Sequence, residues 1–262
     1  MVERNFVWKT FMQRTQVWAS GGGVQSAAIA ALIVQGKLRP DLCIIVDTER
    51  EQSTTWDYMD SVITPALASV GVTLHRVRKS EFEHRDLYGG KDSDTLLVPA
   101  FTTQSGDVGK LSNFCSSYWK REVIKRWVNS QGVKAVDMWL GISVDEMGRV
   151  QAKRSSKWAN RYPLIEARMN RGDCVALVES MGWPTPPRSS CYHCPNHTQH
   201  EWREIRLRPA DWQAAVQLDR ELREHDPDVF LHSDCVPLEQ ADLDDKNGVL
   251  FGHACASGHC FT

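Results

Sequence analysis

The stretch Ser20-Gly21-Gly22-Gly23-Val24-Gln25-Ser26 decides the fold, because it links an apolar run that ends at Ala19 to a helix-like stretch that ends at Gln35. Glycines let the backbone turn tightly and approach a ligand closely. The N–H groups and the positive dipole end of the following helix attract an anion. A strand, a glycine-rich turn and a helix in this order are typical of phosphate binding, so we expect a nucleotide ligand.

The chain around this loop alternates strand-like and helix-like runs. The expected strands cover residues 15–19, 42–46, 73–78 and 135–140, and the expected helices cover residues 24–35, 53–69 and 119–131. This alternation predicts an α/β fold with a doubly wound parallel sheet and helices on both faces. Ligands in such folds bind beyond the carboxyl ends of the strands. We therefore expect Ser20, Asp47 and Gly141 at the edge of one site.

The chain has 262 residues, 42% of them hydrophobic, which suffices for one large domain or for a core domain with an appendage. We expect a nucleotide-binding domain over residues 1–183. Residues 184–262 are expected to hold a Cys-x-x-Cys segment, a helical appendage and a cysteine-bearing tail. Residues 88–117 are rich in Gly, Ser, Asp and Thr, and we expect them to form a mobile loop at the active site.

Charge and hydropathy point to a cytoplasmic protein. No apolar run approaches the roughly 20 residues that span a bilayer, and residues 1–12 lack the pattern of a secretory signal. We therefore expect no membrane partner. The formal net charge of −2 gives no overall reason to bind nucleic acid, although local basic clusters such as residues 120–126 could do so. The sequence leaves the oligomeric state open, and a homodimer is compatible with it.

Three interpretations of the glycine-rich loop compete. A Walker loop is excluded because no Gly-Lys-Ser/Thr follows at the required spacing. A dinucleotide fold is favoured by Gly21-x-Gly23-x-x-Ser26 and by Asp47 at the end of the next strand. The loop also resembles a variant of the Ser-Gly-Gly-x-Asp-Ser loop of the ATP pyrophosphatase (PP-loop, adenine nucleotide alpha hydrolase) superfamily. It has the form found in phosphoadenosine phosphosulfate (PAPS) reductases and their relatives, with Gln25 at the usual acidic position.

Four later segments resemble PAPS-reductase-like proteins in the same order along the chain. They are Asp47-Thr48-Glu49 with Thr55 and Tyr58, Gly141-Ile142-Ser143-Val144-Asp145-Glu146 with Arg149, Tyr162-Pro163-Leu164, and Ser190-Cys191-Tyr192-His193-Cys194-Pro195. Ser143 stands where the family usually has arginine. The ordered set spans residues 15–200 approximately and is far more specific than any single segment.

The resemblance implies a binding site for ATP. The hydroxyls of Ser20 and Ser26, with the backbone N–H groups of residues 21–25, would hold the β- and γ-phosphates. Asp47 would lie near the ribose or adenine. Thr48 and Gly141 would also bind the nucleotide.

The same resemblance implies that Asp145 and Glu146 are candidate ligands for Mg²⁺, and that Arg149 neutralises phosphate oxygens. Ser20, Ser26 and these three residues would form the catalytic set. The residues alone also fit a local ion-pair turn that only stabilises a loop.

Eight cysteines in a reducing compartment favour metal binding or thiol chemistry over disulfides. Cys43 and Cys174 lie in apolar runs and are expected in the core. Cys191 and Cys194 form a Cys-x-x-Cys pair, which supplies half of a four-ligand site. Cys115 precedes a basic helix, as one cysteine does in relatives that carry a [4Fe-4S] cluster. The resemblance therefore implies a cluster on Cys115, Cys191, Cys194 and a fourth ligand, which is Cys260 or else Cys255 or His197, while zinc and free thiols are the alternatives.

The activity that the resemblance implies is that of an ATP pyrophosphatase that adenylates an acceptor oxygen so that sulfur can replace it. The nearest functional analogue is the sulfur-inserting ATPase of DNA phosphorothioation. That analogy implies DNA backbone phosphate as the acceptor and a cysteine desulfurase as the sulfur donor, and a tRNA thiolase is a second choice of acceptor.

Two other activities compete with sulfur insertion. The first is reduction of APS or PAPS, although the tail lacks the Glu-Cys-Gly motif of PAPS reductases. The second is a nucleotide-binding subunit without catalysis, which Gln25 and Ser143 would suit because they depart from the family pattern.

Overall fold

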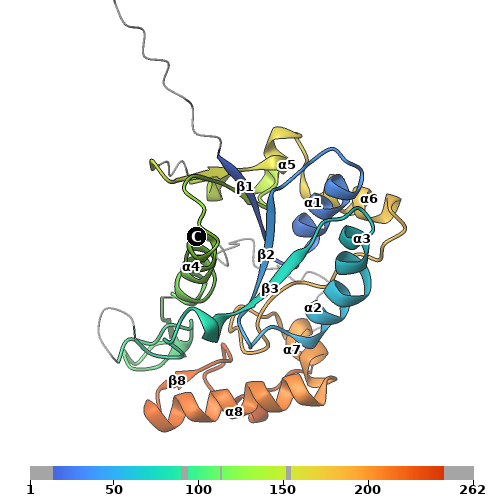
Figure 1. Cartoon of the computed structure of the whole chain (residues 1–262). Helices are drawn as coiled ribbons and strands as arrows, with labels where there is room; N and C mark the ends of the chain where they lie inside the picture. Colours follow the sequence, from blue (N-terminus) through green and yellow to red (C-terminus); the bar gives the residue numbers. More distant parts are fainter. Residues whose placement is uncertain (1–13, 90–93, 113, 152–154, 245–262) are drawn as a thin grey trace, which may run out of the picture.

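A computed structural model describes residues 14–89, 94–112, 114–151 and 155–244 of the chain. Its centre is a five-stranded parallel sheet with the strand order β3-β2-β1-β6-β7 (Figure 1). The strands are β1 (Thr15–Ser20), β2 (Leu42–Asp47), β3 (Leu74–Arg78), β6 (Val136–Leu140) and β7 (Trp158–Arg161). The predicted α/β fold with a parallel sheet is confirmed.

The strand order reverses at β1, which pairs with β2 on one side and β6 on the other. Ala19 stands opposite both Ile44 and Leu140. The chain builds β1, β2 and β3 outward in one direction and then returns to place β6 on the other side of β1. Ligands in open α/β sheets bind at such a reversal, beyond the carboxyl ends of the strands. The segment after Ser20 lies at this point.

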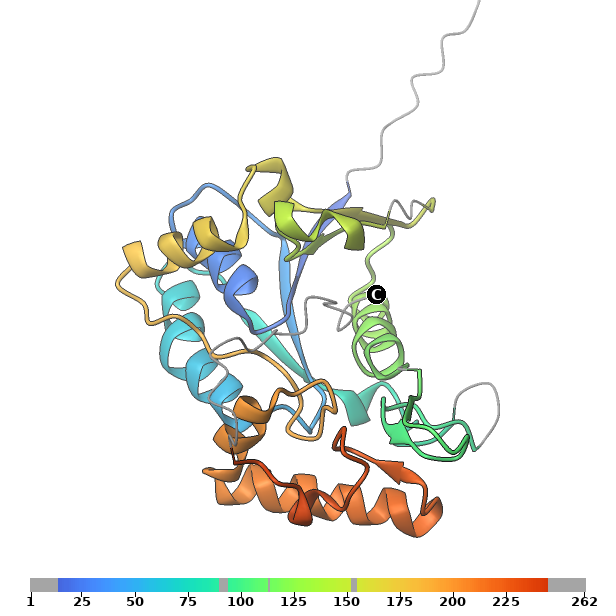
Figure 2. The same cartoon turned by 180° about the vertical axis from the view of Figure 1, so that it is seen from behind.

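Helices cover both faces of the sheet (Figures 1 and 2). One face carries α1 (Val24–Val34), the continuous helical stretch of α2 (Ser53–Tyr58), η1 (Met59–Ile63) and α3 (Thr64–Ala68), then α5 (Pro163–Glu166) and α6 (Arg171–Ser180). The other face carries α4 (Val123–Ser130), which continues the helical turn η3 (Ser116–Glu122).

Strand β1 shows why two faces are needed, since Trp18 packs with α1 on one face and Val17 and Ala19 pack with α4 on the other. The expected core residues Cys43 and Cys174 are buried in the first of these layers, and burial raises the pKa of each thiol to about 12.

The C-terminal part is helical, as predicted, and shares its core with the segment before η3. It consists of α7 (Gln199–Arg206), α8 (Pro209–His225) and β8 (Val229–Phe230). Strand β8 pairs with β4 (Phe101–Thr102), which pairs with β5 (Gly109–Lys110), in a small antiparallel sheet. Inside this core Asp219 is fully buried and accepts the backbone N–H groups of Leu231 and Leu238, both at 3.0 Å.

The described part of residues 88–117 lines the candidate site, as expected, but part of it is packed in a core, and its mobility stays a prediction. Leu97, Val98 and Ala100 are completely buried in or beside the core that α7 and α8 complete. The abundance of Gly, Ser, Asp and Thr concealed this short apolar run. Three short 3₁₀ turns complete the described elements: η2 (Lys79–Glu81), η4 (Val144–Arg149) and η5 (Leu238–Gln240). Among the described helices, none combines the length and the hydropathy needed to cross a membrane.

Candidate functional site

The glycine-rich loop of residues 20–26, named the phosphate loop for the ligand that the sequence predicts, joins β1 to α1, and its own serines fix its shape. The Ser26 hydroxyl accepts the Gly21 N–H at 2.7 Å, and the Ser20 hydroxyl accepts the Gly22 N–H at 3.4 Å. Gly22 has φ +77°, and a Cβ there would lie 3.0 Å from Thr55 Cγ2. Glycine is therefore required at this position by backbone conformation and by space. The loop presents the N-terminus of an 11-residue helix, as the sequence predicts.

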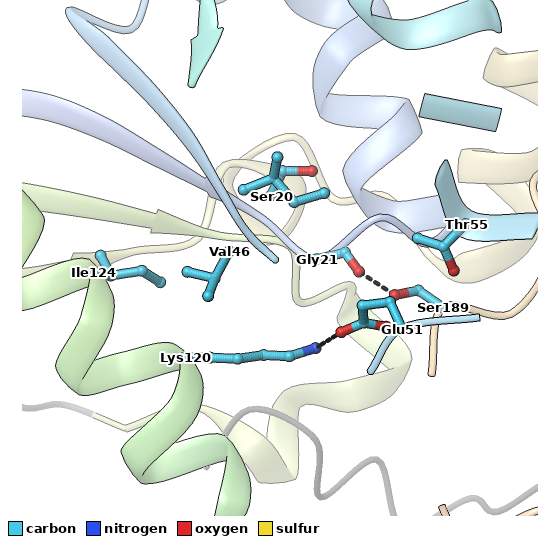
Figure 3. Close-up of a pocket in the computed structure, with 9 residues that line it drawn as sticks. Ser20, Gly21, Val46, Glu51, Thr55, Lys120, Ile124 and Ser189 are labelled. Atoms are coloured by element: carbon cyan, nitrogen blue, oxygen red, sulfur yellow. Dashed lines mark hydrogen bonds and ion pairs between the residues drawn. The ribbon is translucent and has the colours of Figure 1, made fainter. Parts of the chain in front are cut away.

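A cavity beside the loop contains a buried ion pair that the sequence did not reveal. Lys120 Nζ lies 2.7 Å from Glu51 Oε1, and the two side chains are 15% and 3% exposed (Figure 3). The second carboxylate oxygen of Glu51 is buried without a hydrogen-bond partner. The cavity is lined by Ser20, Gly21, Ile45, Val46, Glu51, Thr55, Lys120, Ile124 and Ser189. A cation and an unsatisfied polar atom thus face the loop that is expected to bind phosphate.

The Cys-x-x-Cys segment docks directly on the segment that follows β2 and on the phosphate loop. Cys191 and Glu51 form a β-bridge, and Gln52 donates its N–H to the Ser190 carbonyl at 3.1 Å and its amide to the Ser190 hydroxyl at 2.8 Å. One residue earlier, the Ser189 hydroxyl donates to the carbonyl of Gly21 (Figure 3). The structure therefore brings together two motifs that are about 170 residues apart.

Three of the four predicted cysteine ligands line a single cavity, which is called the cysteine cavity below. They are Cys115, at the start of η3, and Cys191 and Cys194. Lys120 and Ser189 line this cavity and the phosphate-loop cavity alike. Burial raises the pKa of the Cys191 thiol well above its ordinary value, and the neighbouring Glu51 carboxylate raises it further.

The predicted fourth ligand, Cys260, lies outside the described residues, and so does Cys255. The remaining candidate, His197, is buried, and its Nε2 lies 2.9 Å from the Cys191 carbonyl. His197 thereby holds the turn of the Cys-x-x-Cys segment. His193 lies in the same turn, and burial lowers the pKa of its imidazole to about 3, so that it is neutral near pH 7.

The thiols of Cys115, Cys191 and Cys194 are the candidate metal donors of the site. Within the described ranges, no group of three or more His, Cys, Asp or Glu converges as a single metal ion requires. Each cysteine of a [4Fe-4S] cluster binds a different iron, so its thiols need to surround a cavity rather than meet at one point. Cys115, Cys191 and Cys194 line one cavity, and thiols are the ligands that such clusters use. In donor type these residues suit a cluster, and the cluster itself stays a prediction.

The predicted Mg²⁺ and phosphate ligands form a polar network with Gln25 of the loop. Gln25 donates to Glu146 Oε2 at 3.0 Å, and Arg149 Nη1 lies 2.7 Å from Glu146 Oε1. The Asp145 carboxylate accepts the Arg171 N–H at 3.0 Å at the start of α6. The ion-pair turn that the residues alone suggest is therefore present, and the catalytic role of these residues stays a prediction.

Of the other predicted nucleotide ligands, Gly141 lies against the loop, and Thr48 and Asp47 have other contacts. A Cβ on Gly141 would be 3.5 Å from Gln25 Cβ and from the Ser26 backbone nitrogen, so the end of β6 approaches α1 closely. Thr48 is buried with its hydroxyl 3.5 Å from Cys191 Sγ. Asp47 forms an ion pair with Arg76 at 2.7 Å. The contact of Asp47 with the ribose or adenine stays a prediction.

Comparisons with known proteins give distant structural similarity only. No family model matches the chain, and no curated protein matches it. A PAPS reductase from Candida auris, crystallised as a phosphate complex, is 19% identical over 68% of this chain and 78% of its own, with a TM-score of 0.44. The U34-tRNA thiolase NcsA from Methanococcus maripaludis, solved with its [4Fe-4S] cluster, is 14% identical over 89% of this chain and 74% of its own, with a TM-score of 0.47.

Proposed function

We propose that this protein is an ATP pyrophosphatase that adenylates an oxygen of its acceptor and so allows sulfur to replace that oxygen. The observation that carries the proposal is the docking of the cysteine segment on the phosphate loop, with Lys120 and Ser189 lining the cavities on both sides. A site that activates with ATP and then transfers sulfur needs its phosphate-binding groups and its thiols side by side.

The first reaction is adenylation. The acceptor oxygen attacks the α-phosphorus of ATP, a new P–O bond forms, and the bond to pyrophosphate breaks. Negative charge grows on the leaving pyrophosphate, and donors that are already in position stabilise it. The loop N–H groups, the Ser20 and Ser26 hydroxyls and the Lys120 ammonium would serve here. Mg²⁺ would share this task, with Asp145 and Glu146 as its proposed ligands.

In the second reaction a persulfide sulfur attacks the acceptor atom that carries the adenylated oxygen, a bond to sulfur forms, and the bond to the oxygen that leaves with AMP breaks. A thiol reductant would then supply two electrons to cleave the S–S bond and leave one sulfur on the acceptor. Cys115, Cys191 and Cys194 would hold a [4Fe-4S] cluster, which when bound supplies iron as a binding site for sulfur. The buried residues Trp119, Ser190 and His193 form part of the wall of this cavity and would limit competing attack by water. DNA backbone phosphate as acceptor and a cysteine desulfurase as sulfur donor are the specific partners that we propose.

Iron content and pyrophosphate release test this proposal together. We expect protein purified without oxygen to hold iron and sulfide and to release pyrophosphate from ATP and Mg²⁺ when acceptor is present. Cys191→Ser should remove the iron, whereas the control Cys235→Ser should keep it, because Cys235 does not line the cysteine cavity. Retention of iron in Cys191→Ser would show that Cys191 is not a ligand of a cluster.

Reduction of APS or PAPS is the second candidate. It would use a finished sulfonucleotide and release sulfite with no pyrophosphate. Sulfite formation from PAPS, without pyrophosphate from ATP, would favour this candidate. Tight ATP binding without either product would favour a nucleotide-binding subunit.

A further inference from the structure

A third cavity opens beyond the carboxyl ends of β2 and β3, beside the cysteine cavity. Its walls come from the segment after β2, including Thr48 and Arg50, and from the segment after β3, including Lys79 and Asp86. Thr48 lines this cavity and the cysteine cavity as well. A ligand bound here would therefore lie next to the predicted sulfur site.

Two cations in this cavity are held by a single carboxylate. Arg50 Nη2 and Lys79 Nζ each lie 2.7 Å from a different oxygen of Asp86. The cationic side chains are only 18% and 8% exposed, whereas the Asp86 side chain is 51% exposed. Both cations also lie over the ring of the buried Trp119, at 5.8 and 5.1 Å from its centroid. Arg50 and Lys79 are thus held by contacts inside the protein, and of the three side chains Asp86 is the most exposed to solvent.

The other carboxylates of the cavity bind elsewhere. Glu83 pairs with Arg85 and Arg126, both at 3.3 Å. Glu49 accepts the N–H and the hydroxyl of Ser80, at 3.1 and 2.9 Å. Asp86 is therefore the carboxylate with which an incoming anion would compete for Arg50 and Lys79. A guanidinium has five N–H donors and an ammonium three, so these cations can bind more than one oxygen.

We propose that this cavity is a phosphate-binding subsite in which a phosphate group takes the place of Asp86 between Arg50 and Lys79. The assignment of that phosphate to the sulfur acceptor rests on the proposed function. Under that function the acceptor would extend from this cavity into the cysteine cavity, with which it shares Thr48. The subsite would hold a phosphate of the acceptor while the neighbouring cavity holds the reacting atoms.

Inorganic phosphate is the probe for this subsite, titrated calorimetrically into protein already saturated with a non-hydrolysable ATP analogue. The analogue occupies the phosphate loop, so further phosphate binding reports on another site. We expect Arg50→Gln to raise the dissociation constant of phosphate at least about tenfold. Asp86→Asn should lower it, because the competing charge is removed. The control Lys125→Gln should leave it unchanged, since Lys125 pairs with Glu122 and does not line the cavity.

In a binding site, Arg50→Gln and Asp86→Asn change the dissociation constant of phosphate in opposite directions. In a purely structural ion-pair cluster, both variants would lower the stability of the protein and neither would change phosphate binding specifically. No phosphate binding to the analogue-loaded protein, or the same dissociation constant in both variants, would overturn the subsite. Failure of the analogue itself to bind is measured first and would count against the proposed function instead. Displacement of phosphate by a short single-stranded DNA would identify the source as a polynucleotide, and its absence would identify a small phosphorylated acceptor.

Discussion

At the scale of single residues, Gly22 is the point at which the phosphate loop packs against Ser189, next to the Cys-x-x-Cys segment. Ala at this position would adopt an unfavourable φ and would press against Thr55 and Ser189. Gly71 is a matched control, because it has φ +76° and nothing within 4 Å of an added Cβ. We expect Gly71→Ala to lower the free energy of unfolding by about 1 kcal/mol. Gly22→Ala should cost roughly 1–3 kcal/mol more and should weaken ATP binding, as urea unfolding and nucleotide titration would show. Equal effects of the two variants would mean that the loop and Ser189 are not tightly packed.

The Lys120–Glu51 pair allows a structural role to be separated from a catalytic one. Lys120→Met leaves the buried Glu51 carboxylate without its cation, which typically costs about 3–5 kcal/mol. The double variant Lys120→Met/Glu51→Gln removes both charges and should recover most of that stability. We expect pyrophosphate release to stay at least tenfold below wild type in the double variant, since the cation that faces the phosphate loop is still missing. Recovery of both stability and activity would assign the pair a purely structural role.

The sequence predicts the residues of this site unevenly. The phosphate loop and the cysteines could be found because each motif is local. Glu51, Lys120 and Ser189 could not be found in this way. A β-bridge between residues 51 and 191 brings Glu51 close to Ser189, and Lys120 reaches the same cavity from the helical stretch η3. Such contacts leave no spacing pattern in the chain.

At the scale of elements, the start of α7 depends on one carboxylate. Thr198 and Glu201 form a capping box, and Arg188 Nη1 lies 2.6 Å from Glu201. Burial alone would raise the pKa of Glu201, but the His197 ring at 3.9 Å and the hydrogen bonds from Arg188 and the Thr198 backbone lower it well below its ordinary range.

Because its pKa is lower in the folded state, Glu201 stabilises the fold fully above its unfolded pKa, and this contribution is lost as pH falls below that value. We expect Glu201→Gln to be less stable than wild type near pH 7 and to approach wild type as the pH falls below about 4.5. Urea unfolding at pH 7 and pH 3.5 would check this. A stability difference that is independent of pH would contradict the assignment.

Elements with apolar runs were predicted well, and of the two edge strands of the parallel sheet β3 was predicted and β7 was not. Strands β1, β2 and β6 contain such runs, whereas β3 (Leu74–Arg78) has only two apolar residues and was predicted from the alternation of strands and helices. Strand β7 was missed because Trp158-Ala159-Asn160-Arg161 is an edge strand with every residue half-buried, so no alternation marks it. Strands β4 and β5 have two residues each, which is too short for a pattern.

At the scale of the whole molecule, one continuous helical stretch connects the parallel sheet to the C-terminal core. Trp119, in η3, packs in the core that α7 and α8 complete, whereas Val123 and Trp127, in α4, pack against the sheet. Lys120 lies between these two packing regions. The position of the Lys120 ammonium in the site therefore depends on both cores, and a change in the C-terminal core can reach the site without touching it.

This shared core predicts how the chain responds to truncation. A fragment that ends at residue 183 lacks α7, α8 and β8, and so it exposes Val98, Trp119 and their neighbours. Each large apolar side chain contributes about 1.5–3 kcal/mol when buried, and the total stability of a domain is only about 5–15 kcal/mol. We expect fragment 1–183 to lose cooperative thermal unfolding by circular dichroism. The control fragment 1–244 retains all three described cores and should unfold cooperatively. Cooperative unfolding of fragment 1–183 at the midpoint of the longer fragment would show that residues 1–183 fold alone, as an independent nucleotide-binding domain would.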